Sequence, residues 1–282
     1  MKRLRVFLEM IRFEHTIFAL PFAYLGIILA ADGWPTWWVF FWVTVAMASA
    51  RTLAMAANRL IDRAIDARNP RTAGRALPRR LITPRVVILI GAVSLLIFEV
   101  AAAALNPLCL ALSPAAVALL VGYPYAKRYT WLSHWILGLT DGLAPIGGWI
   151  AVTGWIDPPA LLLWVAVTFW ITGFDLIYAC QDVRFDVAEG LYSVPACFGV
   201  AVALDVARLC HGITLVALVA AGFVMHLHPV YWAGWLGALV LLVYEHSLVS
   251  PTDLSRVDVA FFNVNGYISI LVFAATLVAV LL

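Results

Sequence analysis

Two groups of polar, oxygen-bearing side chains recur at helical spacing in this sequence. In the segment "NRLIDRAID", Asn58, Asp62 and Asp66 are four residues apart. Residues four apart lie on one face of an α-helix, so these oxygens are expected to point the same way. Carboxylates repeated on one face repel each other unless positive charge lies between them. That charge can be arginine, which is plentiful in the segment, or Mg²⁺, which prefers oxygen ligands and is usually completed by substrate phosphates.

The second group lies in "FDLIYACQDVRFD", where Asp175, Tyr178, Asp182 and Asp186 follow at intervals of three, four and four. On a continuous helix these four span an arc of about 80°. A single such motif is typical of a solvated surface, but two at membrane ends favour a functional site. Facing each other, the two groups would hold two or more Mg²⁺ ions with a diphosphate between them, and nearby basic side chains would bind the remaining phosphate charge.

The composition predicts a polytopic membrane protein. The chain has 282 residues, of which 64% are hydrophobic and 12% charged, whereas soluble domains are roughly half apolar and a quarter charged. We expect one domain over residues 1–282 and no nucleic-acid partner. The four cysteines form no CxxC pair and no ligand-spaced cluster with histidine, which predicts free thiols.

Nine apolar segments approach the ~20 residues that a helix needs to cross a membrane. They lie near residues 16–31, 37–57, 86–104, 108–124, 135–152, 160–180, 200–225, 229–248 and 260–281. The connectors "ADGWPT", "LNP", "TGWIDPP" and "MHLHP" contain no lysine or arginine, whereas the alternate connectors and the N-terminus are basic. The positive-inside rule therefore predicts a cytoplasmic N-terminus and places both acidic groups at the cytoplasmic face of a plasma (inner) membrane. The basic N-terminus is expected to remain in place as an amphipathic lead-in rather than a signal peptide.

These motifs resemble those of the UbiA superfamily of intramembrane prenyltransferases. "NRLIDRAID" is similar to the first family motif, NDxxDxxxD, with Arg59 in place of an acid. The second group matches DxxYxxxDxxxD, and "YPYAKR" matches a third motif, YPxxKR, through Tyr123, Lys127 and Arg128. The resemblance covers essentially the whole chain. It is strongest to the 4-hydroxybenzoate polyprenyltransferase-like branch, which includes the ubiquinone type and the MqnP type of quinone-pathway enzyme.

The resemblance implies an all-α bundle of about nine transmembrane helices around a central cavity open to the cytoplasmic side. It implies an enzyme that transfers a polyprenyl group from an allylic diphosphate to an aromatic acceptor such as 4-hydroxybenzoate or a related naphthoate, with Mg²⁺ as cofactor. Tyr123 and Tyr178 would stabilise the allylic cation, and Arg59 would either leave the first metal site to its neighbours or contact phosphate. The expected metal ligands are Asn58, Asp62, Asp66, Asp182 and Asp186, and the expected diphosphate-binding residues are Lys127 and Arg128, followed by Arg63 and Arg75.

Three further residues are candidates for handling the acceptor. Arg51 lies seven residues before Asn58, on nearly the same helix face, and an arginine at that depth needs an anionic partner. Arg51 either pairs with an acid of the bundle, Glu99 or Asp141, or contacts the acceptor or the diphosphate. Arg12 is a second candidate for contacting the acceptor.

Asp175 lies deeper than Asp182 on one helical face, where it could orient Tyr178, accept the ring proton of the acceptor, or simply be satisfied by a hydroxyl or by protonation. Asp141 has no assigned role.

Other functions remain open on the sequence alone. A secondary transporter also has two related polar sites, although near the membrane midplane. A phosphatidyltransferase would need its aspartates in one contiguous motif, and a UbiA relative could use haem or another non-aromatic acceptor. The acceptor, the length of the prenyl chain and the oligomeric state are not specified.

Overall fold

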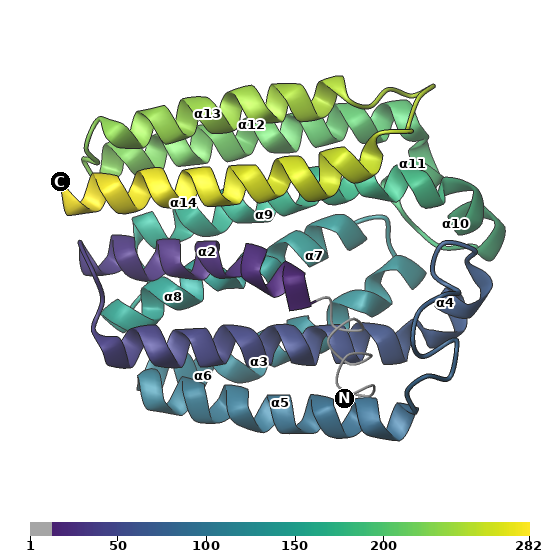
Figure 1. The fold of residues 1–282 in the computed structure, drawn as a ribbon, viewed down its shortest axis with the longest axis horizontal. Helices are drawn as coiled ribbons and strands as arrows, with labels where there is room; N and C mark the ends of the chain where they lie inside the picture. The colour runs from purple at the N-terminus through teal and green to yellow at the C-terminus, as the bar shows by residue number, and fades with distance from the viewer. Residues whose placement is uncertain (1–12) are drawn as a thin grey trace.

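The protein is a bundle of helices that run nearly parallel to one another (Figure 1). The computed structural model describes residues 13–282, and side chains from residue 20 onward; in this range no β-strand occurs beyond an isolated bridge between Ser250 and Asp253. The long helices are α2 (Phe13–Ala31), α3 (Trp37–Ile61), α5 (Pro84–Leu105), α6 (Pro107–Gly122), α7 (Ser133–Asp141), α8 (Leu143–Thr153), α9 (Pro158–Ala179), α12 (Val200–Val224), α13 (Val230–Ser247) and α14 (Asn265–Leu281). The short helices are α4 (Arg63–Arg68), η1 (Tyr123–Arg128), η2 (Cys180–Asp182), α10 (Val183–Glu189), α11 (Val194–Phe198) and the π-helical η3 (Val259–Val264).

The all-α, multi-pass membrane class is confirmed. Seven helical segments of the described chain are long and apolar enough to cross a membrane, and Leu20–Ala31 is a shorter apolar helix. The helix α13 is not among these candidates. The count of nine spans therefore stays a prediction.

The helices pack in three groups. Helices α12, α13 and α14 lie on one side of the molecule, and α3, α5 and α6 lie on the other (Figure 1). Between them lie α2, α7, α8 and α9, with α9 packed on α12 and α7, and α2 packed on α8 and α14. The main core cluster follows these contacts through Leu163, Leu176, Ile177 and Leu204, each at most 1% exposed. The middle group, α2, α7, α8 and α9, therefore forms the centre of the bundle, packed between the two outer groups.

The starts of several helices follow from local sequence signals. Asn106 accepts a hydrogen bond from the Cys109 amide at the start of α6, and Asp157 accepts one from Ala160 at the start of α9. Each cap is followed by proline at the first helical position, where no backbone donor is needed. These caps fix the short connectors at the end of the bundle where α6 and α9 begin.

The fifth span is broken between α7 and α8, and small residues let α8 approach α2. Figure 1 shows the two half-helices as separate pieces. A Cβ on Gly148 would lie 2.5 Å from the Ala23 carbonyl oxygen of α2. The segment "PIGGWIAVTG" thus allows close helix contact at this residue.

The short helices α4, η1, α10 and α11 gather at one end of the bundle, at the right of Figure 1, whereas the C-terminus lies at the opposite end. We call this the motif end. It carries both acidic groups, because α3 leads into α4 and α9 leads into α10 at the same end.

The two adjacent glycines of α8 give a test of the helix contact. We expect Gly148→Ala to lower the thermal unfolding temperature, because a methyl group forced against α2 costs about 1–3 kcal/mol. Gly147→Ala is the matched control, since nothing lies within 4 Å of its added Cβ. Unfolding in lipid nanodiscs measures both. Equal stability of the two variants would contradict the packing described here.

Candidate active site

The central aspartate of each motif lies at a break between helices. Asp62 separates α3 from α4 with φ −87° and ψ 2°, and Asp182 precedes α10 with φ −96° and ψ 1°. Both lie in the sparsely populated bridge region, where active-site residues are often found. The second group, from Asp175 to Asp186, therefore does not lie on one regular α-helix. The 3₁₀ turn at Cys180–Asp182 interrupts it, so the carboxylates beyond Asp182 are not aligned along one straight face.

Asp62 is almost fully buried, at 1% exposure, and two cations hold its carboxylate. Lys127 Nζ lies 2.5 Å from Oδ2, and Arg128 donates to Oδ1 at 3.0 Å. Arg128 also donates to the carbonyl oxygen of Ile61, one of the acceptors left open where α3 ends. The third motif, in η1, is thus placed against the first.

Asp66 is buried as well, at 4% exposure, and pairs with a different cation. Arg75 donates to Asp66 Oδ1 at 2.7 Å, while Oδ2 is buried without a hydrogen-bond partner in the described chain. Thr72 donates to the Asp66 carbonyl oxygen at 3.0 Å and so holds the loop after α4 against the motif.

Asp182 receives its hydrogen bonds from that same loop. Arg71 binds both carboxylate oxygens, with Nε 3.0 Å from Oδ1, and Asn69 donates to Oδ1 at 3.0 Å. Arg71 also donates to the Tyr178 hydroxyl at 2.8 Å and lies over the tyrosine ring, 5.0 Å from its centroid. Burial opposes the charge of Arg71, but the hydrogen bond and charge of Asp182 outweigh it and raise the guanidinium pKa above its ordinary value. The loop therefore joins the two motifs.

Asp186 has a neutral partner, Ser193, whose hydroxyl donates to Oδ2 at 3.0 Å. A further ion pair between Arg68 and Glu189, at 2.6 Å, connects α4 to α10. Within residues 13–282 no three His, Cys, Asp or Glu side chains converge as a cluster that could hold a metal ion. The acidic motifs are neighbours whose charges are balanced by basic and amide side chains.

The remaining predicted residues take different positions. Asn58 donates to Asp62 at 3.3 Å and accepts from Arg59, which is buried, at 2.9 Å. Arg63 lies on the exposed face of α4 and has no ion pair among the described residues, because its helix turns Asp62 and Asp66 inward. Arg12 lies outside the residues that the structure describes.

A cavity of about 720 Å³ opens beside these motifs, within the usual range for small-molecule pockets. Leu161 and Tyr178, 17 residues apart in α9, both line it. At a rise of 1.5 Å per residue it therefore follows the helix for roughly 25 Å, close to the thickness of a bilayer's hydrocarbon core. Its wall beside Tyr178 is aromatic, with Phe261 of η3 stacked on the tyrosine at 4.1 Å between ring centroids.

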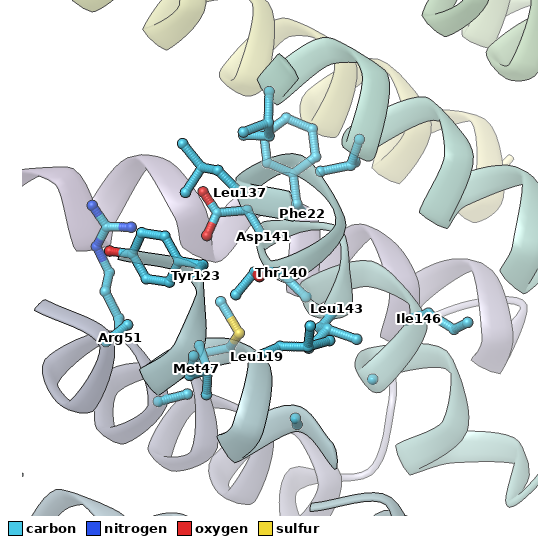
Figure 2. Close-up of a pocket in the computed structure, with 18 of the residues that line it drawn as sticks. Phe22, Met47, Arg51, Leu119, Tyr123, Leu137, Thr140, Asp141, Leu143 and Ile146 are labelled. Atoms are coloured by element: carbon cyan, nitrogen blue, oxygen red, sulfur yellow. The ribbon is translucent and has the colours of Figure 1, made fainter. Parts of the chain in front are cut away.

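The interior of this cavity is mostly apolar, with three polar side chains on one side. Figure 2 shows Arg51, Tyr123 and Asp141 pointing into it, with Met47, Leu119, Leu143 and Ile146 along the rest of the wall. Arg51 forms no ion pair with Glu99 or Asp141, and its Nε is buried without a hydrogen-bond partner in the described chain. Glu99 instead accepts from Ser113 at 2.6 Å. The charge of Arg51 still acts on the carboxylate of Asp141, so the pairing considered for these two residues stays a prediction, without direct contact in the structure.

Sequence reasoning missed two residues that bind Asp182. Asn69 and Arg71 lie just after the first motif, and Asn69 extends its spacing by a further three residues. That spacing could have identified Asn69 as a residue on the same helix face as the motif. The choice of Arg71 over Arg63 depends on how the loop after α4 reaches Asp182 of η2, which spacing does not encode.

Comparison with known proteins places these features in one family. The chain matches the UbiA prenyltransferase family over residues 19–279. The chain belongs to this family. This UbiA-family chain is 32% identical to a 4-hydroxybenzoate octaprenyltransferase of Aeromonas hydrophila, over 89% of this chain and 86% of that protein.

Two solved structures share the fold of this UbiA-family chain. A UbiA homolog from Aeropyrum pernix K1 in its apo form is 32% identical, with a TM-score of 0.86 over 94% of this chain and 98% of that one. A UbiA homolog from Archaeoglobus fulgidus, bound to GPP and Mg²⁺, is 20% identical, with a TM-score of 0.78 over 98% and 100% of the two chains.

Arg71 gives a direct test of the site in this UbiA-family chain. We expect Arg71→Ala to lower kcat/KM for a prenyl diphosphate about 10–100-fold, because hydrogen bonds to charged groups contribute ~1.5–3 kcal/mol. Arg79→Ala, an exposed arginine of the same loop, is the matched control. Initial rates across diphosphate concentrations measure both variants. An Arg71 variant as active as the Arg79 variant would contradict the assignment.

Proposed function

We propose that the chain transfers a polyprenyl group from an allylic diphosphate to 4-hydroxybenzoate or a related aromatic carboxylate, as a step of quinone synthesis. The observation that carries the proposal is the placement of two acid–base motifs beside the mouth of a long apolar cavity. The name of the Aeromonas relative supports the acceptor. The basic connectors support an inner-membrane location with the motif end in the cytoplasm.

The diphosphate would bind at the motif end. Lys127 and Arg128 already lie against Asp62, and Arg75 against Asp66, so small rotations would bring these cations to phosphate oxygens. Arginine binds phosphate through two parallel hydrogen bonds, and lysine acts as a point charge. With Arg71 opposite, cations would surround the leaving group where negative charge develops.

The donor set of the motifs fits Mg²⁺, which takes hard oxygen ligands. Asp66 Oδ2 is a buried carboxylate oxygen without a hydrogen-bond partner among the described residues, as expected of a ligand. Asn58, Asp62 and Asp66 would hold Mg²⁺ at the first motif, and Asp182 and Asp186 would hold it at the second. When bound, Mg²⁺ supplies charge neutralisation for the departing diphosphate. GPP and Mg²⁺ in the Archaeoglobus homolog are consistent with this assignment.

The cavity would hold the isoprenoid tail and exclude water from the allylic carbon. A carbocation in such a cavity would be attacked by water if water were present. Tyr178 and Tyr123 line the wall beside the motif end, and a cation over either ring would gain up to about 2 kcal/mol when desolvated. Arg51, without an ion pair in the described chain, would bind the carboxylate of the acceptor.

Removal of the metal or of either central aspartate should stop product formation. We expect Asp62→Asn and Asp182→Asn each to reduce prenylation of 4-hydroxybenzoate at least ~100-fold, because each weakens stabilisation of the leaving charge. EDTA should do the same and added Mg²⁺ should restore the rate. Mass spectrometry of the product in nanodiscs measures all three. Asp205→Asn, on the exposed face of α12, is the control.

An outcome with full activity in EDTA or in either variant would contradict the proposed chemistry. Movement of a substrate across the membrane without release of diphosphate would instead support a transporter.

A wider side chain at Gly147 tests the tail cavity. Gly147 lines the cavity and has open space around its Cβ, so Gly147→Leu would fill part of it. We expect kcat/KM for a long-chain diphosphate to fall about 10-fold or more, with geranyl diphosphate less affected, because pocket methylenes contribute ~1–3 kcal/mol. Gly212→Leu, equally open but on the outer face of α12, is the control. Equal losses for short and long substrates would place the tail elsewhere.

A further inference from the structure

A buried histidine holds the acid that lies deepest in the second motif. His134 Nδ1 lies 2.7 Å from Asp175 Oδ2. His134 belongs to the first turn of α7 and is 4% exposed, whereas Asp175 of α9 lines the cavity. The two residues are 41 positions apart and belong to different spans, so no local sequence pattern pairs them.

The partners of the ring identify its tautomer. The Val194 amide donates to His134 Nε2 at 3.3 Å, and a backbone N–H can only donate. Nε2 is therefore the acceptor, so the neutral ring carries its proton on Nδ1. Consequently Nδ1–H donates to the Asp175 carboxylate. In this arrangement the histidine ring holds the carboxylate of Asp175 in one orientation.

The backbone around His134 is packed closely against α9. Thr172 donates to the His134 carbonyl oxygen at 3.3 Å, and a Cβ on Gly138 would lie 2.3 Å from the Thr168 carbonyl oxygen. Helix α7 is therefore pressed against α9 along the turn that carries the pair. The other carboxylate oxygen of Asp175, Oδ1, has no hydrogen-bond partner in the described chain and is not sealed from the cavity.

Asp175 lies at the depth expected for the aromatic ring rather than for the diphosphate. It precedes Asp182 by seven residues, just as Arg51 precedes Asn58, and α3 and α9 run in the same direction (Figure 1). At 1.5 Å per residue, Asp175 lies about 10 Å from the break at Asp182, and Arg51 lies about 16 Å from the break at Asp62. Below the motif end the cavity thus presents one oriented carboxylate and, somewhat deeper, one arginine.

We propose that His134 is a positioning residue that aims Asp175 at the ring proton of the acceptor; this rests on the proposed function. The aromatic carbon forms a bond to the allylic carbon, and the allylic C–O bond breaks with its electrons leaving on the diphosphate. The ring C–H bond then breaks, its electron pair restores aromaticity, and the proton passes to Asp175 Oδ1. In a cavity without water, a carboxylate held in place supplies the proton acceptor that solvent cannot.

The test compares two substitutions that each keep one nitrogen position of the histidine. His134→Asn retains an N–H near the Nδ1 position, and His134→Gln retains a polar group near Nε2. The substrates are geranyl diphosphate with 4-hydroxybenzoate carrying either hydrogen or deuterium at the two carbons beside the hydroxyl. Single-turnover rates in nanodiscs give the isotope effect on breaking the ring C–H bond.

We expect His134→Gln to lower kcat at least ~10-fold with a smaller change in KM, because Asp175 accelerates proton removal less when its carboxylate is not held in position. Its isotope effect should rise above that of the unmodified protein, and His134→Asn should restore much of both. Asp175→Asn should show the same increased isotope effect without altering the histidine. His211→Gln, a buried histidine away from the cavity, should change neither quantity.

Loss of rate without any change in isotope effect, or equal rates for the Asn and Gln variants, would overturn the positioning role and leave the proposed function intact. An unmodified protein that releases diphosphate but attaches nothing to the ring would remove the proposed acceptor chemistry, and the role of His134 with it.

Discussion

A carboxylate buried at the end of an apolar bundle needs a cation beside it, and this constraint organises the motif end. Asp62 is 1% exposed, and the cations that balance it come from η1, far away in sequence. Asp66 and Asp182 draw theirs from the loop after α4. The same ion pairs that hold these segments over the cavity therefore assemble the basic groups that a diphosphate needs. Under the proposed function, stability and substrate binding share one set of charges, which a bound diphosphate would redistribute.

Departures from regular helix coincide with residues of the two motifs and of the cavity wall. Asp62 and Asp182 lie at breaks in matching backbone conformations, Asp141 ends α7, and a π-helix carries Phe261 to the cavity wall. A π-turn within a helix often marks a functional site. Asp141 and Phe261 line the cavity, and Asp62 and Asp182 lie in the motifs beside it. The regular parts of α9 and α12 supply the rigid packing that holds these breaks in place.

The sequence was sufficient for the fold class and for the motifs, because hydropathy and spacing are local properties. Asn58, Asp62 and Lys127 lie together in the structure, while the metal and diphosphate roles that the family resemblance implied stay predictions. The sequence was not sufficient to identify the side chains that pair with the motif aspartates. Arg63 and Arg71 are equally basic and both close to the first motif, yet only the path of the loop brings Arg71 to Asp182. The bond between His134 and Asp175 depends on contact between two spans, which periodicity within either span cannot reveal.

The central claim is that the two acidic motifs form one diphosphate site, and a double-mutant cycle tests it most directly. The measurement is Mg²⁺-dependent binding of a slowly ionising thiolodiphosphate analogue of geranyl diphosphate to the unmodified protein, Asp62→Asn, Asp182→Asn and the double variant. We predict one site per chain and strongly non-additive losses, since groups that bind one ligand together are coupled by about 0.5–3 kcal/mol. Additive losses, or binding that survives both substitutions, would contradict the account.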